Sequence, residues 1–113
     1  KNEVLLLDHV LRPASGWGIP GGFMGAGEQA SETLKREVSE ETGLEISNLE
    51  MVRVKTHYRH IEFLYRARAE GEPKVKSREI NAAAWFALDG MPKAMPEAQK
   101  RQIKEVAAGN AAD

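Results

Sequence analysis

The stretch Arg12–Gly27 constrains the fold more than any other part of the chain, because it holds six glycines and two prolines. In a helix interior, glycine costs about 1 kcal/mol and proline about 3 kcal/mol relative to alanine, so a long regular helix is excluded here. We predict turns instead, with short extended pieces around Trp17–Ile19 and Phe23–Met24. At 113 residues, the chain has the length of a single domain.

Regular elements are predicted on both sides of this stretch. The apolar run Glu3–Asp8 suits a strand that is buried on both faces. Further strands are predicted at Leu49–His57, Ile61–Ala69 and Ala82–Leu88, and helices at Glu28–Thr42 and from Pro96 to about Gly109. Gly43 is the predicted C-terminal cap of the first helix. The pattern favours an α/β sandwich.

The first predicted helix places acidic residues on the face that should be buried. Ala30, Leu34 and Val38 define this face through their spacing of four residues. At about 100° per residue, Glu37 and Glu41 fall within about 60° of Leu34, and Glu40 lies at the margin of the same face. Neighbouring carboxylates repel one another when they are partly buried, so a positive charge is expected beside them.

An acidic cluster without histidine or cysteine suits a hard cation, Mg²⁺ or Mn²⁺. The alternative is a solvated acidic face, an interpretation that we adopt for Glu32 and Glu45. The glycines before the helix let the backbone approach a ligand closely. Together, the loop and the helix are typical of a module that holds a metal ion and a phosphate.

The composition excludes several other classes of protein. The 16 basic and 17 acidic residues give a net charge of -1, which argues against a nucleic-acid binder that relies on bulk charge. The lack of cysteine excludes a disulfide scaffold, a thiolate zinc site and a cysteine nucleophile. No apolar run reaches the roughly 18 residues of a membrane span and no signal-peptide pattern is present, so we expect a cytoplasmic protein.

The segment from Gly22 to Leu44, GFMGAGEQASETLKREVSEETGL, resembles a complete Nudix box. The pattern of this hydrolase family is G-x5-E-x7-R-E-U-x-E-E-x-G-U, where U is a bulky aliphatic residue, and every fixed position is matched. The resemblance implies a Nudix-like α/β/α sandwich with a mixed sheet. Such domains usually have one more strand before the equivalent of Val4–Leu7, so we expect an N-terminal strand that is absent from this chain, which starts at Lys1.

The resemblance also implies roles for individual residues. Glu37, Glu40 and Glu41 would bind the metal ion or orient its water, and the backbone carbonyl near Gly21 would complete the coordination. Arg36 would hold the glutamates in place, and Glu28 would support them. Glu79 is a candidate metal ligand or general base; the alternative is a surface glutamate in a loop.

Candidates for substrate binding lie outside the acidic helix. His57 and Arg59 belong to a polar cluster between two predicted strands, which a hairpin turn explains equally well. Arg12 is a candidate phosphate ligand or a solvent-exposed arginine, and Phe23, like Trp17 and Trp85, is a base-stacking candidate or a core residue.

The function implied by the resemblance is metal-dependent hydrolysis of a nucleoside diphosphate linked to a group X, through attack of water on phosphorus. The substrate stays open, and RNA 5′ ends are among the candidates. The alternative from another class is a Nudix-fold module that senses a nucleotide without turnover. The apolar stripe of the last helix, with Ile103, Val106 and Ala107, is predicted to be buried in the chain; the alternative is a contact in a homodimer.

Overall fold

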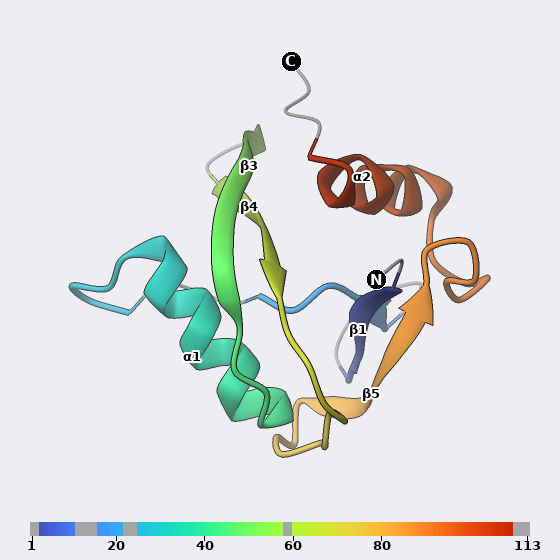
Figure 1. Ribbon diagram of the computed structural model, residues 1–113, viewed down its shortest axis with the longest axis horizontal. Helices are drawn as coiled ribbons and strands as arrows, with labels where there is room; N and C mark the ends of the chain where they lie inside the picture. Colours follow the sequence, from blue (N-terminus) through green and yellow to red (C-terminus); the bar gives the residue numbers. More distant parts are fainter. Residues whose placement is uncertain (1–2, 11–15, 22–24, 58–59, 110–113) are drawn as a thin grey trace.

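The computed structural model describes residues 3–10, 16–21, 25–57 and 60–109. In Figure 1 the helices lie on either side of a central group of strands. The elements are β1 (Glu3–His9), β2 (Trp17–Gly18), α1 (Ala30–Thr42), β3 (Ser47–His57), β4 (His60–Arg68), β5 (Ile80–Ala87) and α2 (Glu97–Ala107). The extended pieces and helices predicted within the described residues are confirmed. The piece predicted at Phe23–Met24 lies outside the described residues.

The strands form two antiparallel groups. β1 lies between β2 and β5, and β3 pairs with β4 as a hairpin in which His57 faces His60. The α/β/α arrangement is confirmed. The parallel pairing of a mixed sheet, however, does not occur among the described strands, because every pairing recorded for them is antiparallel. In the hairpin, the physical reason is the connection: a short turn can join only antiparallel strands.

β1 is buried on both faces, as its apolar run predicts. Leu5 and Leu7 pack into a cluster with Val38 of α1, Leu44 and Ile80. Leu6 points to the opposite face, where it packs with three further buried side chains, Met91, Met95 and Ile103. Alternate side chains of one strand therefore bind both helices to the sheet.

Trp17 and Ile103, for which the sequence left a core position and an external contact open, both lie within this core. The rings of Trp17 and Phe86 meet edge to face with centroids 5.1 Å apart, so Trp17 packs in the core as one of the two interpretations predicted. Ile103 of α2 is also buried inside the chain. The burial predicted for Ile103 is confirmed, so this residue is not available to the alternative, a contact between copies.

A capping box begins α1, and a glycine in the left-handed conformation ends it. The helix begins two residues later than Glu28, the predicted start. Gln29 is the N-cap, its backbone N–H donating to the Glu32 carboxylate over 3.1 Å. At the other end, Gly43 adopts φ 78° and its N–H donates to the carbonyl of Ser39, which confirms the predicted cap.

The loop before β5 is attached to the C-terminal end of α1. The backbone N–H groups of Lys74 and Lys76 donate to the carbonyls of Thr42 and Glu41 over 3.0 and 3.1 Å. These bonds satisfy carbonyls that a helix end leaves without intrahelical partners. The indole N–H of Trp85 fixes the start of the same loop by donating to the carbonyl of Gly71 over 2.8 Å. The loop thereby leads residues 77–79 back toward α1.

Candidate active site

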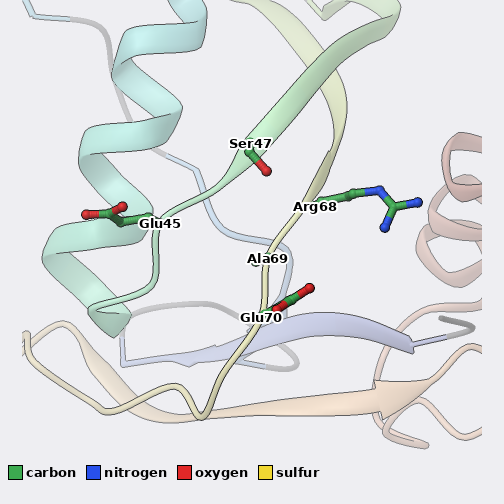
Figure 2. A pocket seen from close by; sticks show the side chains of 5 residues that line it. All are labelled: Glu45, Ser47, Arg68, Ala69 and Glu70. Carbon is green, nitrogen blue, oxygen red and sulfur yellow. The ribbon is translucent and has the colours of Figure 1, made fainter.

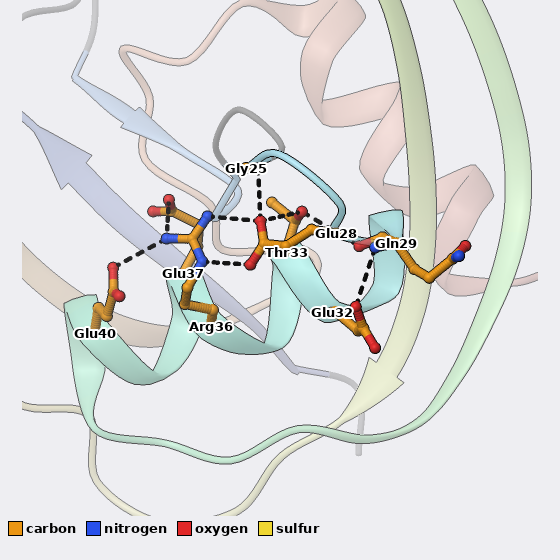
Figure 3. A network of polar contacts seen from close by, with 8 residues as sticks. All are labelled: Gly25, Glu28, Gln29, Glu32, Thr33, Arg36, Glu37 and Glu40. Atoms are coloured by element: carbon orange, nitrogen blue, oxygen red, sulfur yellow. Dashed lines mark hydrogen bonds and ion pairs between the residues drawn. The ribbon is translucent and has the colours of Figure 1, made fainter.

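An ion pair between Glu28 and Arg36 lies at the centre of the polar network of the candidate site (Figure 3). The Nε and Nη2 atoms of Arg36 donate to Oε2 and Oε1 of Glu28 over 2.7 and 3.1 Å. Oε1 also accepts the backbone N–H of Gly25 over 2.6 Å and the hydroxyl of Thr33 over 2.9 Å. The Arg36 bond, followed by the bonds from Gly25 and Thr33, lowers the pKa of Glu28 from 4.5 to about 2.

The same guanidinium reaches two more carboxylates. Nη1 of Arg36 donates to Glu37 over 3.1 Å and to Glu40 over 3.3 Å. Both bonds are drawn in Figure 3, with the arginine lying between the loop carboxylate and the helix carboxylates. The hydrogen bonds that Arg36 donates to Glu28 are the main reason why the pKa of Arg36 is raised above its ordinary value. One arginine thus fixes one glutamate of the loop and two glutamates of α1.

Glu41 is the buried member of the acidic cluster. It is only 6% exposed, and its Oε1 atom has no hydrogen-bond partner within the described part of the chain. The pKa of Glu41 is raised from 4.5 to about 7, and burial is the largest cause. The charge of Glu37 and a hydrogen bond with it raise the pKa further, as do the charges of Glu79 and Glu40. A buried carboxylate surrounded by like charges is costly unless a cation binds it.

These residues fit a divalent cation of the magnesium type. Among the described residues, no group of three or more histidine, aspartate or glutamate side chains forms a ready-made cage. Mg²⁺ does not need one, because it usually takes one or two carboxylates and completes its shell with waters and substrate phosphates. The unpartnered oxygen of Glu41 and the neighbouring Glu37 offer this donor set.

The structure brings some of the predicted residues together. Glu28, Arg36, Glu37 and Glu40 form one bonded network. Glu79, at the end of the loop attached to α1, is close enough for its charge to raise the pKa of Glu41. Its backbone carbonyl accepts the N–H of Val10, so it lies where β1 ends and β5 begins.

Other predicted residues are not brought into this network. Gly21 is exposed, and a Cβ built on it would meet no atom within 4 Å, so a ligand could approach its backbone. Arg12, Phe23 and Arg59 lie outside the described residues. His57 is the last residue of β3, but its side chain is not described either.

Thr33 and Gly25 belong to the network although the sequence analysis did not single them out. Thr33 lies one turn before Glu37 on α1, and its burial places the hydroxyl beside the Glu28 carboxylate. The signal in the sequence that could have identified Thr33 is its place one helical turn before Glu37. No such signal exists for Gly25, because its contribution is a backbone N–H.

A separate hollow lies where the chain leaves the C-terminal end of α1. It is an open cavity of about 290 Å³ lined by Glu45, Ser47, Arg68, Ala69 and Glu70. In Figure 2 the side chains of Glu45 and Arg68 point away from each other, so they do not converge on a common point. The cavity shares no residue with the Glu28–Arg36 network and gives no support to a second reactive centre.

The loop and helix that carry this network identify the chain's class. The NUDIX domain model matches residues 1–106, and the chain therefore belongs to the NUDIX domain family. Among solved structures, a MutT NUDIX hydrolase from Burkholderia pseudomallei is 28% identical with a TM-score of 0.77, and the match covers 94% of this chain and 89% of that one.

Curated relatives extend the comparison to named enzymes. The NAD-capped RNA hydrolase NudC of Pseudomonas aeruginosa is 35% identical over 94 residues, which cover 75% of this chain and 34% of that protein. The human 8-oxo-dGDP phosphatase NUDT18 is 34% identical over 98 residues, which cover 81% of this chain and 30% of that protein. The chain thus spans about a third of the length of these relatives. Within the described residues, no helix is long and apolar enough to cross a membrane.

Proposed function

We propose that this chain is a metal-dependent pyrophosphohydrolase that cleaves a nucleoside diphosphate linked to another group X. The observation that carries the proposal is the buried carboxylate of Glu41, which has an oxygen without a partner in the described part of the chain and lies beside Glu37. Membership of the NUDIX domain family and relatives that are named hydrolases and phosphatases support the same reaction class.

The residues of the acidic helix would hold Mg²⁺ or Mn²⁺. Glu37, Glu40 and Glu41 supply carboxylate oxygens, and the exposed backbone at Gly21 supplies a carbonyl. When bound, the cation neutralises phosphate oxygens and makes the attacking water easier to deprotonate. Oxygen donors without nitrogen or sulfur suit both ions.

The chain's own residues orient the glutamates and deprotonate the attacking water. Arg36 holds Glu37 and Glu40 in place, and Glu28 holds Arg36 by accepting two hydrogen bonds. Glu79, close enough to Glu41 to influence its pKa, accepts a proton from water as that water attacks phosphorus. The bond from phosphorus to the bridging oxygen breaks, and the leaving phosphate carries the electron pair.

The substrate class is tested with a panel. Purified protein is incubated with nucleoside triphosphates, nucleotide sugars, a dinucleoside polyphosphate, NAD and a 5′-NAD-capped RNA, each with Mg²⁺ and with Mn²⁺. We expect cleavage of the diphosphate bond in at least one member, and loss of that cleavage in Glu41→Gln. Tight binding of a panel member without metal-dependent cleavage of any would favour a nucleotide-sensing module and refute the enzyme.

A second candidate substrate is the 5′ end of RNA. The relative from Pseudomonas aeruginosa is named an NAD-capped RNA hydrolase, and that name favours including this substrate. The net charge of -1 offers no bulk attraction to RNA. We therefore expect free NAD and NAD-capped RNA to be cleaved with similar kcat/KM if either is a substrate, whereas a strong preference for the RNA would show that a dedicated RNA-binding surface exists.

A further inference from the structure

We propose that Thr33 is a positioning residue, which anchors Glu28 and, through Arg36, aligns the glutamates of the candidate metal site. The inference rests on the proposed function for its catalytic consequence. Thr33 is 4% exposed and belongs to α1, one helical turn before Glu37. Its hydroxyl faces the loop glutamate rather than the metal-binding end of the cluster (Figure 3).

The hydroxyl proton of Thr33 has two acceptors within reach. Oε1 of Glu28 is 2.9 Å away, and the backbone carbonyl of Gln29 is 3.3 Å away. Threonines in helices commonly bond back to the carbonyl four residues earlier. Here the carboxylate is both nearer and charged, and a charge-assisted hydrogen bond is about twice as strong as a neutral one. The proton is therefore donated to Glu28.

This bond completes the set of contacts that fixes Glu28. Its Oε1 atom receives Gly25 N–H from the loop side and the Thr33 hydroxyl from the helix side, while Arg36 approaches both oxygens. With the carboxylate fixed from two directions, the plane of the guanidinium is fixed as well. The remaining guanidinium nitrogen then reaches Glu37 over 3.1 Å and Glu40 over 3.3 Å.

A valine at position 33 would fill the same space without the hydroxyl. Packing alone would therefore not require a threonine at this buried position. Without the hydroxyl, Glu28 keeps the bonds from Gly25 and Arg36 but loses its bond to the buried side chain of Thr33. We expect the carboxylate to rotate and the Arg36 side chain to sample several orientations.

The test compares Thr33→Val with Thr33→Ser, which keeps the hydroxyl, and uses Thr33→Ala as a second variant lacking the hydroxyl. The first measurement is kcat and KM on a cleaved panel member at saturating Mg²⁺. The second is the ¹H–¹⁵N signal of the Arg36 Nε–H group, assigned by its loss in Arg36→Lys. This signal reports the bond to Glu28 without any need for turnover.

We expect Thr33→Val and Thr33→Ala to lower kcat by about 10-fold with little change in KM, as loss of an outer contact to metal ligands commonly does. The Arg36 Nε–H signal should broaden in both, and Thr33→Ser should restore signal and kcat. An unchanged signal, an unchanged kcat, or failure of serine to restore either would overturn the proposal. If the wild type cleaves nothing, the proposed function fails, and the Nε–H signal alone decides whether Thr33 anchors the pair.

Discussion

The three glutamates of α1 differ in how far water reaches them. Glu40 has a side chain that is 59% exposed, Glu37 is largely buried, and Glu41 is buried. Arg36 bonds the two more accessible carboxylates and leaves an oxygen of the buried one without a protein partner in the described region. A cation bound at Glu41 would therefore supply the partner that this buried oxygen lacks.

The burial of Glu41 predicts how stability depends on pH in the metal-free protein. The pKa of Glu41 in the folded protein, about 7, lies above the ordinary 4.5. Glu41 therefore ionises at lower pH in the unfolded chain than in the folded one, and the free energy of unfolding falls as pH rises between these two values. We expect Glu41→Gln to gain about 1–3 kcal/mol relative to wild type on going from pH 4.5 to pH 8. Urea unfolding with a chelator present measures this gain.

Glu28 is a control because its pKa shift, and so its effect on the pH dependence of stability, has the opposite sign to that of Glu41. Its folded pKa of about 2 lies below the ordinary 4.5, so its contribution to stability is present above 4.5 and is lost as pH falls toward 2. Glu28→Gln should therefore destabilise the protein at pH 7 and less so at pH 3. Parallel pH profiles for the Glu28 and Glu41 variants would contradict both assignments.

At the scale of elements, the C-terminal end of α1 depends on Gly43. Its backbone lies in the left-handed region, with φ 78°, and a side chain there costs about 1–2 kcal/mol. We expect Gly43→Ala to lower the free energy of unfolding by this amount, as measured by urea denaturation. Gly90→Ala is the matched control, because its added Cβ would lie at 3.7 Å from Ala87, an ordinary contact. Equal losses in the two variants would argue against a backbone origin.

Local sequence patterns predicted most of the elements because their determinants are short-range. The apolar run of β1, the Gly43 cap and the alternation in β4 each depend on neighbouring residues. The start of α1 was misplaced because the Glu28 side chain bonds Gly25 and Arg36 instead of joining the helix. The separation of the strands into two antiparallel groups depends on contacts between distant segments, which no local pattern encodes.

The candidate site was predictable to a similar extent. Helical spacing alone separated the partly buried Glu37 and the buried Glu41 from the exposed Glu40. It could not show that the loop before β5 bonds to the carbonyls of Glu41 and Thr42, and so brings Glu79 near Glu41. That contact joins segments more than thirty residues apart and arises from backbone groups.

At the scale of the whole molecule, β1 connects two hydrophobic clusters. Leu7 packs in the cluster on the α1 side and Leu6 in the cluster on the α2 side, and both are fully buried. Truncation of a buried leucine to alanine typically costs about 2–5 kcal/mol. We expect Leu6→Ala and Leu7→Ala to be destabilised within this range in urea unfolding, whereas Met51→Ala, at an exposed position of β3, should change stability by less than about 0.5 kcal/mol.

A small effect of Leu6→Ala beside a large effect of Leu7→Ala would contradict the two-sided core. It would indicate that α2 contributes little to the stability of the sheet. The expected result has a functional consequence as well, because the cluster on the α1 side includes Val38 and Leu44, which flank the acidic residues. The same packing that stabilises the fold holds Glu41 away from water.

The central claim, that the glutamates of α1 bind a catalytic divalent cation, is tested most directly by a magnesium titration of turnover. Wild type and Glu41→Gln are compared on one cleaved panel substrate, with folding of the variant verified by urea unfolding. We predict that wild-type activity depends on Mg²⁺ and saturates, and that Glu41→Gln loses at least about 100-fold of kcat, as expected when several kcal/mol of charge stabilisation are removed. Turnover that persists in a chelator, or a Glu41→Gln variant with wild-type kcat and magnesium dependence, would contradict the account.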